Sequence, residues 1–174
     1  MKKSVNLIAS ALFALAIFFG SNAKAQTSDP NAWRLGIGLE TGIATGAEHD
    51  RGHYDLGGTA RLQYGLSKNL ALTLTSGYYN FFGIENQKKG VDYPNLDIVP
   101  VKIGLKAFYT PNLYFGAEGG VGFITNNSNK KLILSPALGY ANKSWDFSAR
   151  YENFSGQGIS YGVAGLRIAY AFGL

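Results

Sequence analysis

Side chains of two kinds alternate along almost the whole chain, and few folds tolerate such a pattern. From residue 33 onward, large and mostly apolar residues occupy every second position: Trp33, Leu35, Ile37, Leu39, Thr41 and Ile43. The positions between them are small or charged: Arg34, Gly36, Gly38, Glu40 and Gly42. Because successive side chains of a β-strand point to opposite faces, this period of two predicts a strand with two unlike faces. No segment after the first 25 residues has the apolar period of a helix.

The same alternation recurs seven more times, which predicts eight strands. We expect them at residues 33–43, 54–64, 70–78, 99–109, 113–123, 134–140, 145–152 and 165–174. Short connections (65–69, 110–112 and 141–144) alternate with longer, more polar ones (44–52, 80–95, 124–131 and 153–159). An even number of strands joined in this way is typical of an all-β, antiparallel up-and-down barrel. Pro100 and Pro136 have no backbone N–H to donate to a neighbouring strand. We therefore expect a bulge or frayed pairing at these prolines, near the outer ends of their strands.

Charged residues share one face of these strands with many glycines. The set contains six basic and five acidic side chains: Arg34, Glu40, Asp55, Arg61, Lys102, Lys106, Glu118, Asp146, Arg150, Glu152 and Arg167. An eight-stranded interior is only just wide enough for side chains, and glycines on the inward face make room there. A soluble ligand-binding barrel would have the opposite arrangement, with an apolar interior and a polar exterior. We therefore expect a charge network in the lumen, in which Arg34 and Arg167 pair with carboxylates such as Glu118 and Glu152, because unpaired buried charges are costly.

Aromatic residues on the opposite, apolar face form two groups. Near the short connections lie Trp33, Tyr64, Tyr109, Phe115, Tyr140, Trp145, Tyr170 and Phe172. Near the long connections lie Tyr54, Tyr78, Phe123 and Tyr151. Two aromatic belts on either side of an aliphatic band match the two interfaces of a membrane. Since lipid offers no hydrogen-bond partner to a strand edge, the last strand must pair with the first, and the pattern predicts an eight-stranded transmembrane β-barrel.

The N-terminal segment has the features of a cleaved signal peptide. Lys2 and Lys3 precede an apolar run at residues 7–19, and Ala23-Lys24-Ala25 has the small-x-small form of a cleavage site. We expect a signal peptide at 1–25 and one barrel domain at 26–174, exported to the bacterial outer membrane. Cleavage would remove three lysines and lower the formal net charge from +5 to +2. The positive charge of the precursor therefore does not indicate nucleic-acid binding, and we expect no nucleic-acid partner. The chain has no cysteine, which excludes disulfides and thiol chemistry.

Four segments carry a family resemblance: the opening strand 33–43, the turn 65–69, the segment 146–151 and the alternating last strand. They resemble the small outer-membrane β-barrels related to OmpX and the barrel domain of OmpA, in the porin-like superfamily, over residues 33–174. The resemblance implies insertion by the outer-membrane assembly machinery, which reads an aromatic-ended final strand. This chain departs from that pattern, because it ends Phe172-Gly173-Leu174. The resemblance therefore implies that the assembly machinery recognises Phe172 and Tyr170.

Three groups outside the lumen are candidates for chemistry. Residues 158–162 match the G-x-S-x-G pattern of a hydrolase nucleophile at Ser160, but no helix is expected to follow, as that motif requires. Residues 48–53 contain both histidines and two acids in a long connection. This segment could bind a metal, supply a catalytic base or be a solvated loop, and the sequence leaves these alternatives open. Lys88-Lys89 and Lys130-Lys131 lie in outer connections and either pair with lipopolysaccharide phosphates or are only solvated. We expect no catalytic residue, no metal and no cofactor.

The functional expectation is a structural or surface-interaction protein of the outer membrane, not an enzyme. The charged lumen would be plugged, the long connections would lie outside the cell, and the expected partners are outer-membrane lipids and lipopolysaccharide. Two alternatives stay open. An enzyme that modifies lipid A would need Ser160 and His53 to converge with an acid at the outer rim, and a narrow channel would need a gap in the charge network.

Overall fold

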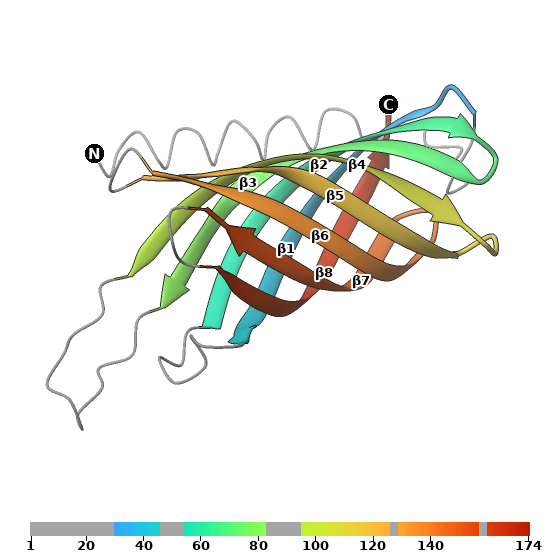
Figure 1. Cartoon of the computed structure of the whole chain (residues 1–174). Coiled ribbons are helices and arrows are strands. Elements are labelled where there is room, and N and C mark those ends of the chain that lie inside the picture. The colour runs from blue at the N-terminus through green and yellow to red at the C-terminus, as the bar shows by residue number, and fades with distance from the viewer. Residues whose placement is uncertain (1–29, 46–53, 83–94, 126–128, 157–159) are drawn as a thin grey trace, which may run out of the picture.

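Eight antiparallel strands close into a barrel (Figure 1). The computed structural model describes residues 30–45, 54–82, 95–125, 129–156 and 160–174. The strands are β1 (Trp33–Thr45), β2 (Tyr54–Ser67), β3 (Leu70–Phe82), β4 (Leu96–Phe108), β5 (Leu113–Ile124), β6 (Lys130–Ala141), β7 (Trp145–Ser155) and β8 (Tyr161–Gly173). Each strand pairs with the next in sequence and β8 pairs with β1, so the predicted up-and-down barrel is confirmed. The expected signal peptide lies outside the described residues and stays a prediction.

Several strands extend further toward the long connections than the alternation predicted. β3 continues to Phe82, β4 begins at Leu96 and β6 begins at Lys130. The predicted ends were wrong because inward positions in these extensions hold apolar residues such as Tyr79 and Ile133. The contrast between the two faces therefore disappears while the backbone remains extended.

The strands are strongly staggered around the barrel. Following the Cα partners once around the sheet from Leu35 on β1 leads back to β1 at Thr45, ten residues further along. A stagger of this kind tilts the strands against the barrel axis. Lumen side chains that meet at one level consequently come from very different distances along their own strands.

Each of the two strand prolines interrupts one ladder and leaves the other intact. Pro100 pairs with Gly122 on β5 but has no partner on β3, and Pro136 pairs with Ala117 on β5 but has none on β7. The register is the same on both sides of each interruption, so neither proline makes a bulge. The interrupted pairing agrees with the expectation from the sequence. The expected position near the outer end holds for Pro100 and is wrong for Pro136, which lies in the middle of β6.

The outer surface of the barrel is apolar and the lumen is polar. Leu39 is 67% exposed and Leu166 60%, whereas the neighbouring Glu40 and Arg167 are each 1% exposed. Water-soluble proteins rarely expose a continuous apolar surface larger than a few hundred Å². Here apolar side chains face outward on all eight strands, so the exterior faces lipid. No helix among the described residues is long and apolar enough to cross a membrane.

Two apolar clusters lie inside the barrel, one toward each end. We call the end with the long connections the outer end and the end with the short turns the inner end. The outer cluster contains Tyr79, Phe81, Ile98, Ile124, Ile133, Phe154 and Val163. The inner cluster contains Ala71, Phe108, Tyr114 and Ala141. On β4, Lys102 and Lys106 lie between Ile98 of the outer cluster and Phe108 of the inner one, so charged side chains occupy the level between two apolar clusters.

Candidate functional site

The charged side chains predicted for the lumen do lie there. All eleven are buried or nearly so, and they come from six strands: Arg34 and Glu40 on β1, Asp55 and Arg61 on β2, Lys102 and Lys106 on β4, Glu118 on β5, Asp146, Arg150 and Glu152 on β7, and Arg167 on β8. Alternation places them there, because each occupies a position in phase with the inward face of its strand. We refer to these eleven residues as the lumen network.

Eight members of the lumen network form a closed ring of alternating acids and bases. Arg150 contacts Glu40 and lies 3.4 Å from Glu152 (Nη2–Oε2). Lys102 Nζ lies 2.5 Å from Glu152 Oε1 and 3.7 Å from Glu118 Oε2. The circuit continues through Arg61, Asp146 and Arg167 and returns to Glu40, with ion-pair distances of 3.0, 3.8, 3.6 and 2.9 Å. Each carboxylate in the ring therefore faces at least two cations, as buried charges require.

Hydroxyl groups donate to two carboxylates of the ring, Glu40 and Glu118. Tyr79 donates to Glu40 Oε2 at 2.5 Å and accepts a hydrogen bond from Lys102 Nζ at 2.8 Å. Thr73 and Thr75 donate to Glu118 Oε1 at 3.0 and 2.7 Å. Thr59 donates to Glu40 Oε1 at 2.9 Å. Glu152 Oε2 has no hydrogen-bond partner among the described residues and lies 3.4 Å from Arg150 Nη2, so an ion pair balances its charge there.

Asp146 lies at the inner end of the ring and is surrounded by three bases. Asp146 contacts Lys106 directly and accepts a hydrogen bond from the Tyr114 hydroxyl at 2.6 Å, in addition to its pairs with Arg61 and Arg167. The Tyr114 ring packs where Gly139 has no side chain, because a Cβ at Gly139 would overlap the ring. Three cations thus share one carboxylate at this level.

The structure specifies partners for Arg167 and Arg34 that the sequence prediction did not name. Arg167 pairs with lumen carboxylates as expected, but these are Glu40 and Asp146, not the examples Glu118 and Glu152. Arg34 Nη2 donates to the carbonyl oxygens of Asn142 and Lys143, at 3.2 and 2.6 Å, in the turn between β6 and β7. These partners follow from the stagger of the strands, which alternation alone does not specify.

Asp55 lies apart from the ring. Its side chain is fully buried near the outer end, and neither carboxylate oxygen has a hydrogen-bond partner among the described residues. Residues 46–53, which precede it, lie outside the described part of the chain. Asp55 is therefore a lumen residue but not a member of the ring.

The sequence prediction missed three polar side chains of the lumen. Tyr79 lay beyond the predicted end of its strand, and Tyr114 was placed on the inward face without a role. Lys131 was assigned to an outer connection, but it belongs to β6, is buried, and donates to the Gly156 carbonyl at 2.6 Å. Continuing the two-residue period beyond the predicted strand ends would have identified both Tyr79 and Lys131.

The remaining candidates for chemistry lie at the outer end. Lys130 is exposed, with its ammonium 5.4 Å from the centre of the Phe123 ring. Lys88-Lys89 and the histidine-containing segment 48–53 lie outside the described residues. Ser160 is exposed, and β8 begins at the next residue, so a strand follows where the nucleophile motif requires a helix. Within the described part of the chain, no three histidine, aspartate or glutamate side chains gather to hold a metal.

The two aromatic groups lie on the outer surface as the alternation placed them. Near the inner end, Trp33 and Tyr64 are in ring contact with centroids 4.7 Å apart, and so are Trp145 and Tyr170 at 5.2 Å. Near the outer end, Tyr54 stacks on Phe82 at 4.6 Å. Aromatic rings at both ends of an aliphatic band are typical of transmembrane barrels.

Fold and surface together define the class of protein. A closed eight-stranded barrel with an apolar, aromatic-belted exterior and a charged interior is an integral membrane protein of the bacterial outer-membrane type. Ion pairs allow the charges of the ring to be buried, and closure of the sheet leaves no free strand edge toward lipid.

Solved structures of small outer-membrane barrels share this fold. The attachment invasion locus protein Ail of Yersinia pestis matches with a TM-score of 0.58 at 13% identity, covering 83% of this chain and 100% of Ail. The N-terminal β-barrel domain of Pseudomonas aeruginosa OprF matches with a TM-score of 0.53 at 14% identity, covering 82% and 98%. Likeness at this level of identity shows the fold, and it confirms the architectural resemblance expected from the sequence. No protein-family model matches the chain, and no curated protein sequence does.

Proposed function

We propose that this outer-membrane barrel has a structural or surface-interaction role, with a lumen closed to ions and contacts made at its outer end. The observation that carries the proposal is the ring of ion pairs, which joins side chains of β1, β2, β4, β5, β7 and β8 across the lumen. An eight-stranded interior is just wide enough to be filled by its own side chains.

The space left beside the ring supports a closed lumen. Two cavities lined by lumen side chains have volumes of about 10 Å³ each. A volume of this size admits about one water molecule, whereas conduction needs a continuous column of water. The apolar clusters at the two ends of the lumen add barriers to hydrated ions.

Conductance of the purified, refolded full chain in planar bilayers tests the closed lumen. We expect no discrete current steps above the baseline of protein-free bilayers. Correct folding is checked on the same sample by its faster migration on gels without boiling. Regular current steps from a fully folded sample would contradict the proposal and favour the narrow channel.

For contacts at the outer end, we propose that phosphates of lipopolysaccharide are partners of exposed basic residues. Lys130 supports this, because its side chain is exposed beside Phe123, a ring of the outer aromatic belt, at the level where lipid phosphates lie. Lys131 does not take part, since its ammonium is turned inward to a backbone carbonyl.

A charge reversal at each end of the barrel separates this contact from a general effect of charge. Lys130→Glu is compared with Lys143→Glu, which changes an exposed lysine in an inner turn. We expect added lipopolysaccharide to raise the thermal midpoint of the wild type and of Lys143→Glu, with a smaller rise for Lys130→Glu. Equal rises in all three proteins would contradict the proposed partner at Lys130.

A further inference from the structure

A groove lies on the lipid-facing surface of the barrel near its inner end. Its volume is about 480 Å³, and it is lined mainly by side chains of β5, β6, β7 and β8. The hollow arises at Ala149 on β7, whose cross-strand neighbours on the outward face are Leu138 and Leu166. A methyl group between two longer side chains leaves a space that neither neighbour fills. Tyr140 and Phe147, which pair with each other, border the groove on the side of the inner turns.

The groove is apolar and begins at the inner aromatic belt. Tyr109 and Tyr140 belong to that belt, and both line the groove together with aliphatic side chains such as Leu138. Aromatic belts lie at the level of lipid headgroups, and the aliphatic band beyond them lies among acyl chains. A groove of this volume is within the range of sites that hold small ligands. We therefore expect an acyl chain in it, with the lipid headgroup next to the inner turns.

The turn between β6 and β7 offers such a headgroup a positive charge. Lys143, in this turn, has an exposed side chain. It lies three residues beyond Tyr140, so at about 3.3 Å per residue its backbone is roughly 10 Å or less from the border of the groove. The headgroup region of one leaflet is about 5–8 Å thick, and a long lysine side chain reaches across such a distance.

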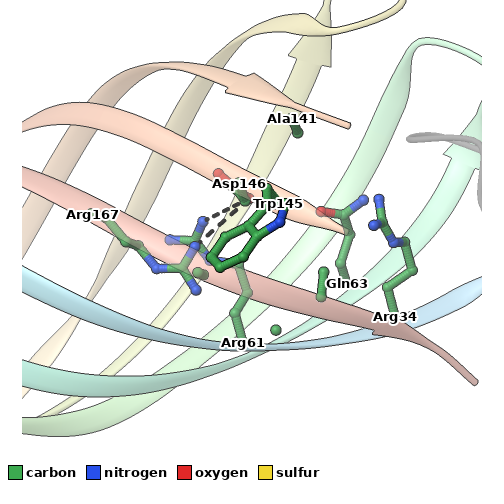
Figure 2. Close-up of a pocket in the computed structure, with 10 residues that line it drawn as sticks. Arg34, Arg61, Gln63, Ala141, Trp145, Asp146 and Arg167 are labelled. Carbon is green, nitrogen blue, oxygen red and sulfur yellow. Dashed lines mark ion pairs between the residues drawn. The ribbon is translucent and has the colours of Figure 1, made fainter. Parts of the chain in front are cut away.

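Arg34 on β1 holds the backbone of this turn. Its Nη2 donates to the carbonyl oxygens of Asn142 and Lys143, at 3.2 and 2.6 Å. Figure 2 shows the Arg34 guanidinium on the opposite side of this part of the lumen from Arg61 and Arg167, the ion-paired arginines of the ring. Arg34 is thus placed at the end of the lumen where it supports the turn.

Further hydrogen bonds fix the same turn. Asn142 Oδ1 accepts from the backbone N–H groups of Ser144 and Trp145, at 2.9 and 2.8 Å. The Ser144 carbonyl accepts from the N–H of Ala171 on β8, at 2.7 Å. Because the backbone is already held from β1 and β8, only the Lys143 side chain has to become ordered when a ligand binds. A preorganised site of this kind has a lower entropic cost of binding.

We propose that the groove and Lys143 together bind one anionic glycerophospholipid of the inner leaflet. One acyl chain lies in the groove over Ala149, and the phosphate lies at the Lys143 ammonium. Lysine binds phosphate as a point charge, and a lysine near the membrane surface attracts anionic lipid. A zwitterionic headgroup carries its own cation beside the phosphate. An anionic headgroup, such as that of phosphatidylglycerol, is therefore preferred.

Charge and position favour a phospholipid over the other candidates for this surface. Short turns of outer-membrane barrels are periplasmic, so the groove lies in the leaflet opposite to lipopolysaccharide. A second copy of the chain would offer Lys143 no acidic partner at its inner turns. Those turns, 65–69, 110–112 and 141–144, contain two lysines and no aspartate or glutamate.

Lipid binding to the purified, refolded full chain is measured by native mass spectrometry. Phosphatidylglycerol or phosphatidylcholine with the same acyl chains is added to the detergent, and the wild type should bind phosphatidylglycerol more tightly. Lys143→Glu keeps the carbonyl that Arg34 contacts and should bind phosphatidylglycerol at least about fivefold more weakly, with little change for phosphatidylcholine. Ala149→Leu fills the groove and should weaken the binding of both lipids.

Two matched variants separate the site from general effects of substitution. Lys143→Arg keeps the charge and should keep the preference for phosphatidylglycerol. Ala117→Leu enlarges an exposed, outward-facing alanine of β5 outside the lining of the groove and should bind both lipids as the wild type does. Folding of every variant is checked by its migration on gels without boiling. Equal wild-type affinities for the two lipids, or unchanged binding in Ala149→Leu, would overturn the proposal.

A photoreactive lipid locates the bound molecule. Phosphatidylglycerol with a diazirine in one acyl chain is incorporated into phosphatidylcholine vesicles with the refolded full chain, and the adducts are mapped on peptides. We expect adducts concentrated at residues 138–149 and 166–168, and fewer there in Ala149→Leu and Lys143→Glu. Adducts spread evenly over all eight strands would indicate an unspecific lipid shell, and a groove without adducts in a chain that crosslinks to itself would indicate a second copy. Either result would overturn the proposal.

Discussion

Replacing Lys102 by methionine removes one cation from the ring while keeping the length of the side chain. Lys102 is fully buried, pairs with Glu152 at 2.5 Å and Glu118 at 3.7 Å, and donates to Tyr79 at 2.8 Å. Because methionine has a similar volume, no cavity is created, and the effect comes from the lost charge. Among the described residues, Glu152 would then keep only its longer ion pair with Arg150.

The expected cost follows from breaking a buried ion pair by removing one partner. Such changes cost about 3–5 kcal/mol because an uncompensated charge stays buried. Lys102→Met should therefore lower the free energy of unfolding by about 3–5 kcal/mol. Lys130→Met is the matched control: Lys130 is exposed, its described contact is with the Phe123 ring, and it should lose about 1 kcal/mol or less.

A double variant tests whether charge is the cause. Lys102→Met combined with Glu152→Gln removes a base and an acid together, while Arg150 keeps its pair with Glu40. The double variant should lose less than the sum of the two single losses, by about 0.5–3 kcal/mol. The assay is urea-dependent unfolding in lipid vesicles, followed by the gel shift between folded and unfolded bands. A loss below about 1 kcal/mol for Lys102→Met, or strict additivity in the double variant, would refute a dehydrated ring of ion pairs.

Two further pairs of variants test the two faces of the barrel, both measured by the same unfolding assay. Gly120→Ala should cost about 1–3 kcal/mol, because its Cβ would overlap the Val101 carbonyl and lie 2.6 Å from Lys102 Cα, whereas Gly58→Ala has open space and should be within about 0.5 kcal/mol of the wild type. Equal stabilities for these two variants would contradict the close backbone approach at Gly120. Leu134→Arg places a charge in lipid at mid-strand and should cost about 2–4 kcal/mol, whereas Leu113→Arg, at the start of β5 near the inner interface, should cost about 1 kcal/mol or less. If the exterior faced water, neither arginine variant would lower the free energy of unfolding.

The architecture could be predicted from the sequence because its cause is local. A strand alternates its side chains between two environments, so lipid on one side and a charged lumen on the other leave a period of two in each segment. That pattern was sufficient for eight strands, for the direction of the charged face and for the aromatic belts. It failed at the outer strand ends, where inward residues such as Tyr79 and Phe81 are apolar and Lys131 is polar beyond the predicted boundary.

The partners within the lumen were decided only by the tertiary structure. Arg150 and Glu40 meet although they are 110 positions apart, because the stagger of the closed sheet brings them to one level. A shift of two residues in any register would preserve the alternation and every face assignment, yet it would change every ion pair on that strand. The sequence by itself therefore determined which side chains are inside the barrel. Closure and stagger determined which acid meets which base.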